Sequence, residues 1–208
     1  MTISIPVDRS QPSSQAHLAP LTSRRSAQVL KAPGPNDTEL GAILQAACTG
    51  PDHGMLRPYR FVVVRQDGQA ALADALEGAL VQSQPGASPE QRSKVRSKTS
   101  QAPCLVVLVA SPLVGHKVPE WEQVAAATCA GFGLLLAADL IGFGAVWKTA
   151  GVMAGAALTT LLQLEPAEQL LGWVNLGSRG PGEPAPRAAP ELVEIASVLD
   201  GNELRRWG

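Results

Sequence analysis

The sequence is poor in charge of either sign and in aromatic side chains. Charged residues make up 17% and aromatic residues 4% of its 208 residues, and the formal net charge is -1. Proteins whose main partner is a nucleic acid or an anionic membrane usually carry a basic excess, and this chain has none. With 45% hydrophobic residues it still falls in the globular class and can bury a sizeable core.

Cysteine is also scarce. The three cysteines, Cys48, Cys104 and Cys129, are odd in number and show no C-x-x-C spacing. This pattern argues against a disulfide framework of the secreted type. We therefore expect reduced, buried cysteines in a cytoplasmic protein.

Targeting segments and repeats are missing as well. The N-terminus has no basic stretch followed by an apolar one, so no secretory signal is expected. The most apolar run, residues 123–138, is shorter than the ~20 residues that a membrane span needs. We expect a flexible arm over residues 1–16, one domain over 17–180, and a proline-rich tail over 181–208 that can end in a short helix.

Several sequence motifs of well-known sites are absent. The stretch GFGAVW (142–147) lacks the third glycine of a dinucleotide-binding fingerprint and leads from a helix into a strand, the wrong order. There is no phosphate loop and no G-x-S-x-G nucleophile motif. No histidine pair stands at the i, i+4 helical spacing of a metal site, so no metal is expected.

The pattern of apolar residues mixes helices and strands without strict alternation. Strands are expected at Phe61–Val64, at 144–149, at 170–177 and at Cys104–Ala110, which is apolar throughout and so buried on both faces. Helices are expected from His17, from Asp37 or Thr38, over Ala70–Leu80, from Pro89, over Trp121–Ile141 and over 155–164. This arrangement predicts an α+β fold, a sheet covered by helices.

The loop before the Phe61 strand is unusually polar for a simple connection. Within PDHGMLRPY, the residues Asp52, His53, Arg57 and Tyr59 gather around Gly54 and two prolines. A turn between a helix and a strand needs turn residues rather than a group of hydrogen-bonding side chains. The loop is therefore a candidate for binding.

Two further stretches suggest an anionic ligand. Arg24, Arg25 and Ser26 lie near a helix end, and arginine offers paired, charge-assisted hydrogen bonds to phosphate. Lys148 and Thr149 follow a strand and add a cation and a hydroxyl. Each stretch alone is better explained as a solvated element end, whereas the two together favour an anion.

Four segments in order resemble the nitroreductase family, most closely its small single-domain bacterial branch. They are RRS (24–26), PDHGMLRPYRFVVV (51–64), HKVPEWEQ (116–123) and GFGAVWKTAG (142–151), and the resemblance covers about residues 18–177. It implies an α+β fold with a central, mostly antiparallel sheet flanked by helices. It also implies an intertwined homodimer with two FMN molecules at its interface.

The matching positions imply which residues hold the cofactor. Arg24, Arg25 and Ser26 would hold the FMN phosphate and ribityl chain, with Lys148 and Thr149 closing the phosphate end and Trp147 at the same site. Residues of the polar loop would reach the flavin from the partner subunit: Thr49, Pro51, Asp52 and His53. The segment expected to meet the nicotinamide nucleotide comprises Ala137, Ala138, Asp139, Leu140, Ile141 and Gly142.

The activity implied is an FMN-dependent oxidoreductase working by a ping-pong mechanism. NAD(P)H gives a hydride to the flavin, and a small acceptor such as a nitroaromatic or a quinone then takes the electrons. The cofactor supplies this chemistry, so no catalytic residue is predicted, and His53 is only a candidate.

Departures from the family pattern leave alternatives open. Gln28 stands where many members have a lysine near the flavin, so backbone N–H groups or Arg57 become candidates for stabilising the reduced cofactor. Lys148 replaces an arginine, Tyr59 a tryptophan, and Met55 an asparagine. The alternatives are enone reduction or a dehydrogenation on the same scaffold, a flavin-binding protein without turnover, and a helical interaction protein without a cofactor.

Overall fold

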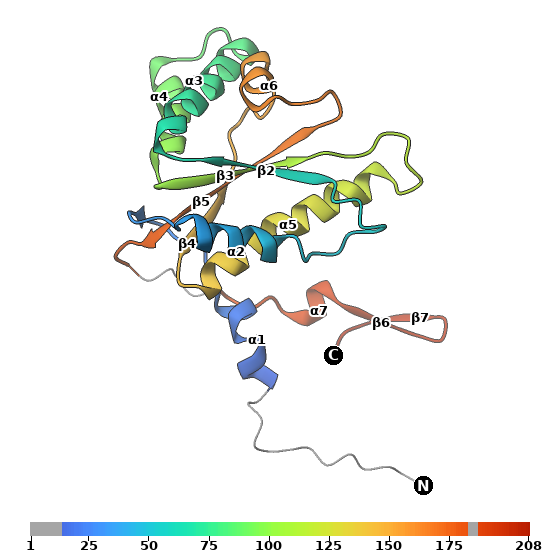
Figure 1. The fold of residues 1–208 in the computed structure, drawn as a ribbon. Helices are drawn as coiled ribbons and strands as arrows, with labels where there is room; N and C mark the ends of the chain where they lie inside the picture. Colours follow the sequence, from blue (N-terminus) through green and yellow to red (C-terminus); the bar gives the residue numbers. More distant parts are fainter. Residues whose placement is uncertain (1–13, 183–186) are drawn as a thin grey trace.

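The computed structural model describes residues 14–182 and 187–208 (Figure 1). Most of the arm expected over residues 1–16 therefore lies outside the described residues. The first helix, α1 (Ser14–Ser23), begins three residues before the expected His17 and contains Pro20.

A five-stranded sheet forms the centre, and every strand pair in it is antiparallel. Strand β5 (Gln169–Arg179) pairs with β1 (Leu30–Lys31), β3 (Cys104–Ala110) and β4 (Gly144–Lys148), and β3 pairs in turn with the edge strand β2 (Tyr59–Val64). All seven residues of β3 are buried, as expected for a continuously apolar strand. The expected α+β fold is confirmed.

Helices cover both faces of the sheet (Figure 1). One core contains residues of β3 and β5 together with α2 (Asp37–Ala47) and α5 (Glu120–Leu140). The other face is covered by α3 (Gln66–Ser83), α4 (Pro89–Arg96), the 3-10 helix η1 (Ser97–Ser100) and α6 (Ala156–Leu162). The two cores follow from the alternation of side chains along β3 and β5.

The N-cap of helix α2 is Asn36, one residue before Asp37 and two before Thr38, the two expected caps. The side chain of Asn36 accepts a hydrogen bond from Glu39 N, and the Glu39 carboxylate accepts one from Asn36 N. This reciprocal pair satisfies two backbone donors at the helix start. The expected apolar face is confirmed, because Leu40, Ile43 and Ala47 are buried.

Helix α5 packs closely because it carries glycine at its contacts. A Cβ on Gly131 would lie 2.4 Å from Cζ3 of Trp147, and one on Gly133 would lie 3.1 Å from Cα of Ala47. The helix is long and apolar enough to compare with a membrane span by length and composition, and it is the one such helix in the described part of the chain. Its contacts with α2 and the sheet are those of a core helix.

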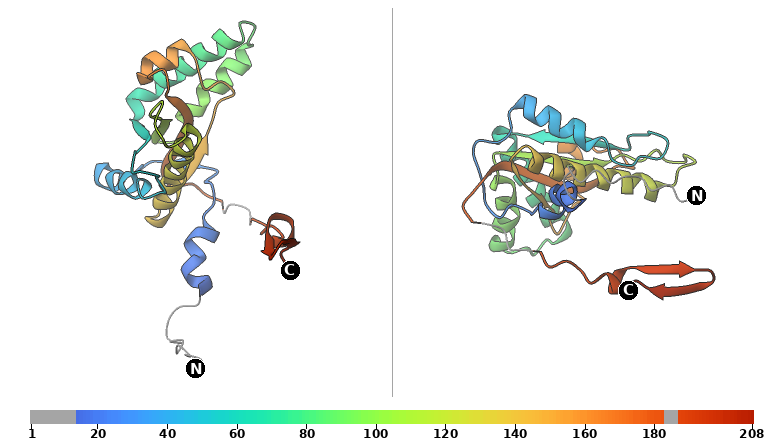
Figure 2. Two further views of the ribbon diagram at one scale, coloured as in Figure 1. Left: turned by 90° about the vertical axis from the view of Figure 1, so that its right-hand side faces the viewer. Right: turned by 90° about the horizontal axis from the view of Figure 1, so that it is seen from below.

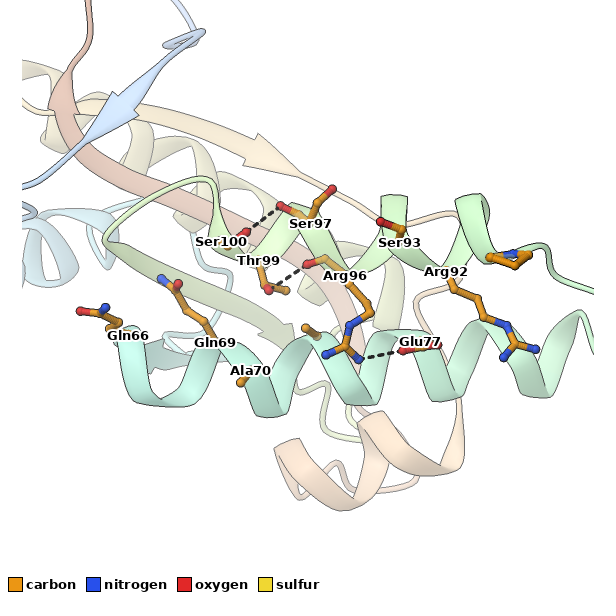
Figure 3. A pocket seen from close by; sticks show the side chains of 12 residues that line it. Gln66, Gln69, Ala70, Glu77, Arg92, Ser93, Arg96, Ser97, Thr99 and Ser100 are labelled. Atoms are coloured by element: carbon orange, nitrogen blue, oxygen red, sulfur yellow. Dashed lines mark hydrogen bonds and ion pairs between the residues drawn. The ribbon is translucent and has the colours of Figure 1, made fainter.

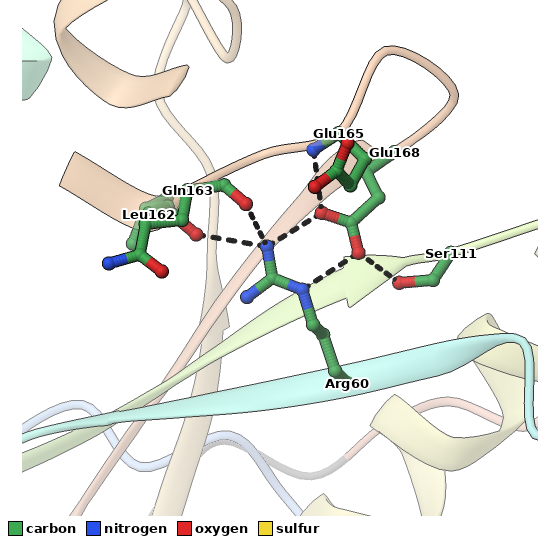
Figure 4. A network of polar contacts seen from close by, with 6 residues as sticks. All are labelled: Arg60, Ser111, Leu162, Gln163, Glu165 and Glu168. Carbon is green, nitrogen blue, oxygen red and sulfur yellow. Dashed lines mark hydrogen bonds and ion pairs between the residues drawn. The ribbon is translucent and has the colours of Figure 1, made fainter. Parts of the chain in front are cut away.

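A polar network joins the ends of three elements where β2 and β5 begin and β3 ends (Figure 4). Arg60 of β2 donates two hydrogen bonds to Glu168, at 2.6 and 2.7 Å, and further ones to the carbonyls of Leu162 and Gln163 at the end of α6. Glu168 also accepts from the Ser111 hydroxyl and from Glu165 N. The network joins β2, the end of β3 and the α6–β5 connection.

The C-terminal segment differs from the expected tail with a short helix. A single helical turn, α7 (Leu192–Ile195), is followed by a hairpin of β6 (Ser197–Asp200) and β7 (Glu203–Arg206). Figure 2 shows this arm projecting away from the body. The sequence contained an unused hairpin signal, Gly201-Asn202, at the turn.

The expectation of three buried cysteines was wrong for one of them. Cys104 is buried and Cys129 is partly buried, whereas Cys48 is exposed. Cys48 is the C-cap of α2, so it stands at a helix end rather than on the packed face.

Candidate functional site

The polar loop after α2 is shaped by one carboxylate. Asp52 accepts hydrogen bonds from the backbone N–H groups of Leu56 (3.2 Å) and Arg57 (2.7 Å). The turn needs positive φ angles at Gly54 (79°), Met55 (52°) and Arg57 (49°). Two of these residues are not glycine, so the carboxylate stabilises a backbone that is otherwise unfavourable.

His53 projects from this loop and contacts the start of α5. Its Nδ1 lies 2.9 Å from Oε2 of Glu122, and its side chain is 65% exposed. This contact joins the PDH segment to the WEQ segment, which are 69 residues apart in the chain.

Gln123, the residue after Glu122, holds the loop that precedes α5. Gln123 is buried, and its side chain accepts from Leu113 N and donates to the carbonyls of Leu113 and Val118. His116 Nδ1 accepts a hydrogen bond from Val118 N. The loop before α5 is thus pinned to the helix that carries Glu122.

Arg24 is the most unusual charged residue of the predicted site. Only 8% of the residue is exposed, and its buried Nη1 has no hydrogen-bond partner among the residues that the structure describes. Burial lowers the pKa of Arg24, and the positive charges of Arg187, Arg25 and Arg179 lower it further. The negative charge of Asp139 acts in the opposite direction and raises the pKa. Asp139 is itself paired with Arg179. A buried cation with a free donor among other cations favours an anionic ligand.

The neighbours of Arg24 in the predicted motif are placed differently. The Arg25 guanidinium donates to the carbonyls of Thr22 (2.6 Å) and Arg24 (3.0 Å), so it closes the end of α1. Ser26 is exposed. The segment continues beside β4, because Ala27 N donates to the carbonyl of Ala145 at 3.0 Å.

The predicted residues of β4 stand at the other end of that strand. Lys148 is its last residue, and the Thr149 carbonyl accepts a hydrogen bond from Lys98 at 2.7 Å. The Trp147 indole donates to the carbonyl of Leu171 and packs over Gly131. From Ala145 to Lys148 the strand advances roughly 10 Å, so Lys148 and Thr149 lie further along β4 than Ala145, which contacts the segment after Arg24.

The remaining predicted positions divide into exposed and buried ones. Thr49 is exposed and donates to the carbonyl of Ala46, and Pro51 is exposed. In the predicted nicotinamide segment, Ala137 and Ala138 are buried in the core, while the end of the segment, residues 140–142, is exposed.

Tyr59 lies at the base of the polar loop. Burial raises its pKa to about 12, with contributions from Cys48, which hydrogen-bonds to it, and from Asp52. The phenol is therefore neutral at physiological pH and can donate or accept a hydrogen bond.

Comparison with known proteins decides the family. The model of the nitroreductase family matches residues 21–178. The chain belongs to the nitroreductase family. This is a family of oxidoreductase enzymes, and the expected resemblance is confirmed.

A relative and two solved structures illustrate the match. A candidate NAD(P)H nitroreductase of Haemophilus influenzae is 36% identical over 160 residues, covering 76% of this chain and 85% of the relative. A nitroreductase-like family protein from Bacillus cereus has the same fold, with a TM-score of 0.75, 20% identity and coverage of 92% and 98% of the two chains. An iodotyrosine deiodinase bound to FMN and 3-iodo-L-tyrosine also shares the fold, with a TM-score of 0.63, 16% identity and coverage of 86% and 98%.

Three residues of this nitroreductase-family site were missed by sequence reasoning. Glu122 was part of a noted segment, but its partner His53 is distant in the chain. Arg179 and Arg187 lie at the end of β5 and beyond it, outside the four motifs. Their only signal was charge next to a proline-rich stretch.

One groove lies elsewhere, between α3 and the α4–η1 segment (Figure 3). It is an open groove of about 680 Å³, and none of the predicted cofactor residues lines it. Its Arg96 is already paired with Asp74 and Glu77. The residues that the sequence predicts for the cofactor lie elsewhere, in the polar loop, around Arg24 and at the end of β4.

Proposed function

We propose that the protein is an FMN-dependent oxidoreductase that takes a hydride from NAD(P)H and reduces a nitroaromatic, a quinone or a similar acceptor. The observation that carries this proposal is the buried Arg24, whose Nη1 has no partner in residues 14–182 and 187–208, within a nitroreductase-family chain. The fold relative with bound FMN supports the choice of cofactor.

The residues fit the phosphate of FMN. Arg24 offers a free donor from a buried guanidinium, and Arg187 adds a second positive charge nearby. Asp139 forms its ion pair with Arg179. Such arginines bind phosphate by paired hydrogen bonds. Ser26 adds an exposed hydroxyl next to them. In the proposal Lys148 and Thr149 approach the ligand further along β4.

When bound, FMN supplies the redox chemistry of both half-reactions. In the proposal each chain holds its own cofactor at Arg24, and its polar loop, shaped by Asp52, presents Thr49 and His53 to the cofactor held by the partner subunit. Tyr59 at the base of this loop adds a neutral phenol that can donate or accept a hydrogen bond.

A homodimer completes the proposal. The outer face of α5 exposes Trp121, Ala125, Thr128 and Phe132, which recur at intervals of four, three and four residues. The C-terminal arm exposes a further set of apolar side chains: Leu192, Ile195, Val198, Leu199, Leu204 and Trp207. Apolar surface of this extent marks an interface, and an isolated hairpin is barely stable in water. We propose that a second copy covers both, in the cytoplasm.

The deiodinase fold relative shows that this architecture hosts another reaction. A different reduction or a dehydrogenation therefore remains the second candidate. Reduction by NAD(P)H followed by reoxidation with a nitroaromatic or a quinone separates the first candidate from it.

The test of the proposal is the FMN affinity of Arg24 variants. Arg24→Ala removes a charge-assisted donor, so we expect FMN binding weaker by roughly tenfold to hundredfold. Arg92→Ala, on the far helix α4, is the matched control and leaves affinity unchanged. Equal affinity in the Arg24 variant and the control contradicts the assignment.

A further inference from the structure

The His53 ring and the Glu122 carboxylate form a hydrogen-bonded pair, and membership of the family does not say what this pair does. The Nδ1 of His53 contacts Oε2 of Glu122 at 2.9 Å, and in the described part of the chain the other ring nitrogen, Nε2, has no hydrogen bond. Because an ionised carboxylate only accepts, the Nδ1 must carry the hydrogen. In the neutral ring, Nε2 is then the free base.

Both partners are held in place by their own elements. The loop that carries His53 is fixed by the hydrogen bonds from Leu56 and Arg57 to Asp52. Glu122 lies in the first turn of α5, next to the buried Gln123 that pins the preceding loop. Two rigid elements that meet at an imidazole and a carboxylate define one orientation of the ring.

Two large apolar side chains near the pair in sequence are exposed. Met55 of the same loop is 84% exposed, and Trp121, next to Glu122, is 70% exposed. Exposed apolar side chains on both elements of the pair are typical of a surface that a ligand or a second chain covers. A simple surface ion pair needs no such setting.

We propose that His53 is the proton donor in the reduction of the acceptor, and that Glu122 is its positioning residue. This inference rests on the proposed function. A hydride brings two electrons and one hydrogen nucleus to a quinone or nitro acceptor, so one proton must follow it. The Nε2–H bond of the doubly protonated ring breaks, an O–H bond of the acceptor forms, and solvent returns the proton to Nε2. Glu122 balances the charge of the ring while both nitrogens hold protons.

The first test reads the tautomer directly and needs no turnover. In ¹⁵N-labelled protein as purified, at a pH where the rings are neutral, long-range ¹H–¹⁵N spectra show which ring nitrogen carries hydrogen. We expect His53 to carry it on Nδ1. His116, whose Nδ1 accepts from Val118 N, carries it on Nε2 and is the internal control. Glu122→Ala should shift His53 toward the Nε2–H form, and Glu122→Gln, which keeps an acceptor, should not. A wild-type His53 in the Nε2–H form overturns the proposal.

The second test separates the two half-reactions by rapid mixing. With both rates measured per FMN bound, His53→Ala should slow reoxidation by a quinone by roughly 10²-fold or more and slow reduction by NAD(P)H much less. Added imidazole should restore part of that rate, which a purely structural role would not show. His116→Gln is the matched control. Reoxidation at the wild-type rate in His53→Ala overturns the proposal, whereas a protein that binds no FMN refutes the proposed function and leaves the tautomer result to stand alone.

Discussion

Asp52 illustrates how a single carboxylate can prepare a site without binding the ligand itself. It satisfies two backbone N–H groups of a loop that needs positive φ at Met55 and Arg57. The residue that sequence reasoning assigned to the cofactor therefore has a clear structural task as well. Its assignment to FMN stays a prediction.

Asp52→Ala should loosen the loop, because two N–H groups lose their acceptor. We expect a loss of about 2 kcal/mol in the free energy of unfolding, measured by urea denaturation. Faster hydrogen exchange at Leu56 and Arg57 should accompany it. Asp52→Asn, which keeps one acceptor oxygen, should lose less. Unchanged exchange at both amides in the alanine variant would show that the loop holds its shape without Asp52.

At the scale of elements, the network around Glu168 couples stability to acid. Hydrogen bonds from Arg60 lower the pKa of Glu168 to about 2, although burial acts in the opposite direction. Because the folded pKa lies below the ordinary value of 4.5, the ionised carboxylate stabilises the fold above pH ~4.5, and this contribution is lost as pH falls toward 2.

Glu168→Gln should therefore cost about 2 kcal/mol of stability at pH 7, and its difference from wild type should shrink between pH 4.5 and 2. Denaturation curves across that range measure it. Glu165→Gln is the matched control, because Glu165 gives the network its backbone N–H and not its carboxylate. A gap that stays constant down to pH 2 would mean that Glu168 is not held ionised by Arg60.

The glycines of the helices supply a second element-scale prediction. A Cβ on Gly131 would lie 2.4 Å from Trp147 and 2.7 Å from Leu108, so Gly131→Ala should destabilise the fold by roughly 1–3 kcal/mol. Gly41→Ala in α2 meets nothing within 4 Å and should stabilise it by about 0.5–1 kcal/mol. Thermal unfolding of both variants checks this. Equal effects would contradict the close packing of α5 on β4.

Local patterns predicted the elements well and their meeting points poorly. The continuous apolar run of β3 predicts a buried strand, and the spacing of Leu40, Ile43 and Ala47 predicts a buried helix face. Both are buried in the structure. The contact of His53 with Glu122 depends on how the start of α5 docks against a distant loop, which no local pattern encodes. The same holds for the charges around Arg24.

The C-terminal hairpin was missed for a different reason. Its turn, Gly201-Asn202, is a local signal that sequence reasoning passed over in favour of a short helix. The strand residues are exposed on all sides, so the alternation that marks a half-buried strand is weak.

At the scale of the whole molecule, the proposed dimer depends on the exposed apolar face of α5. Phe132→Lys places a charge in the proposed interface, so we expect the variant to be monomeric in light scattering and to bind FMN less tightly. Leu161→Lys, on the exposed side of α6, is the matched control and should remain dimeric. A dimer that survives Phe132→Lys would place the interface elsewhere.

The measurement that tests the central claim most directly is the visible absorbance spectrum of the purified protein, titrated without oxygen with NADPH or NADH and then with a nitroaromatic or a quinone. The account predicts flavin bands that bleach with the reductant and return with the acceptor. A colourless protein that also refuses added FMN, or a bound flavin that no nicotinamide nucleotide bleaches, would contradict it.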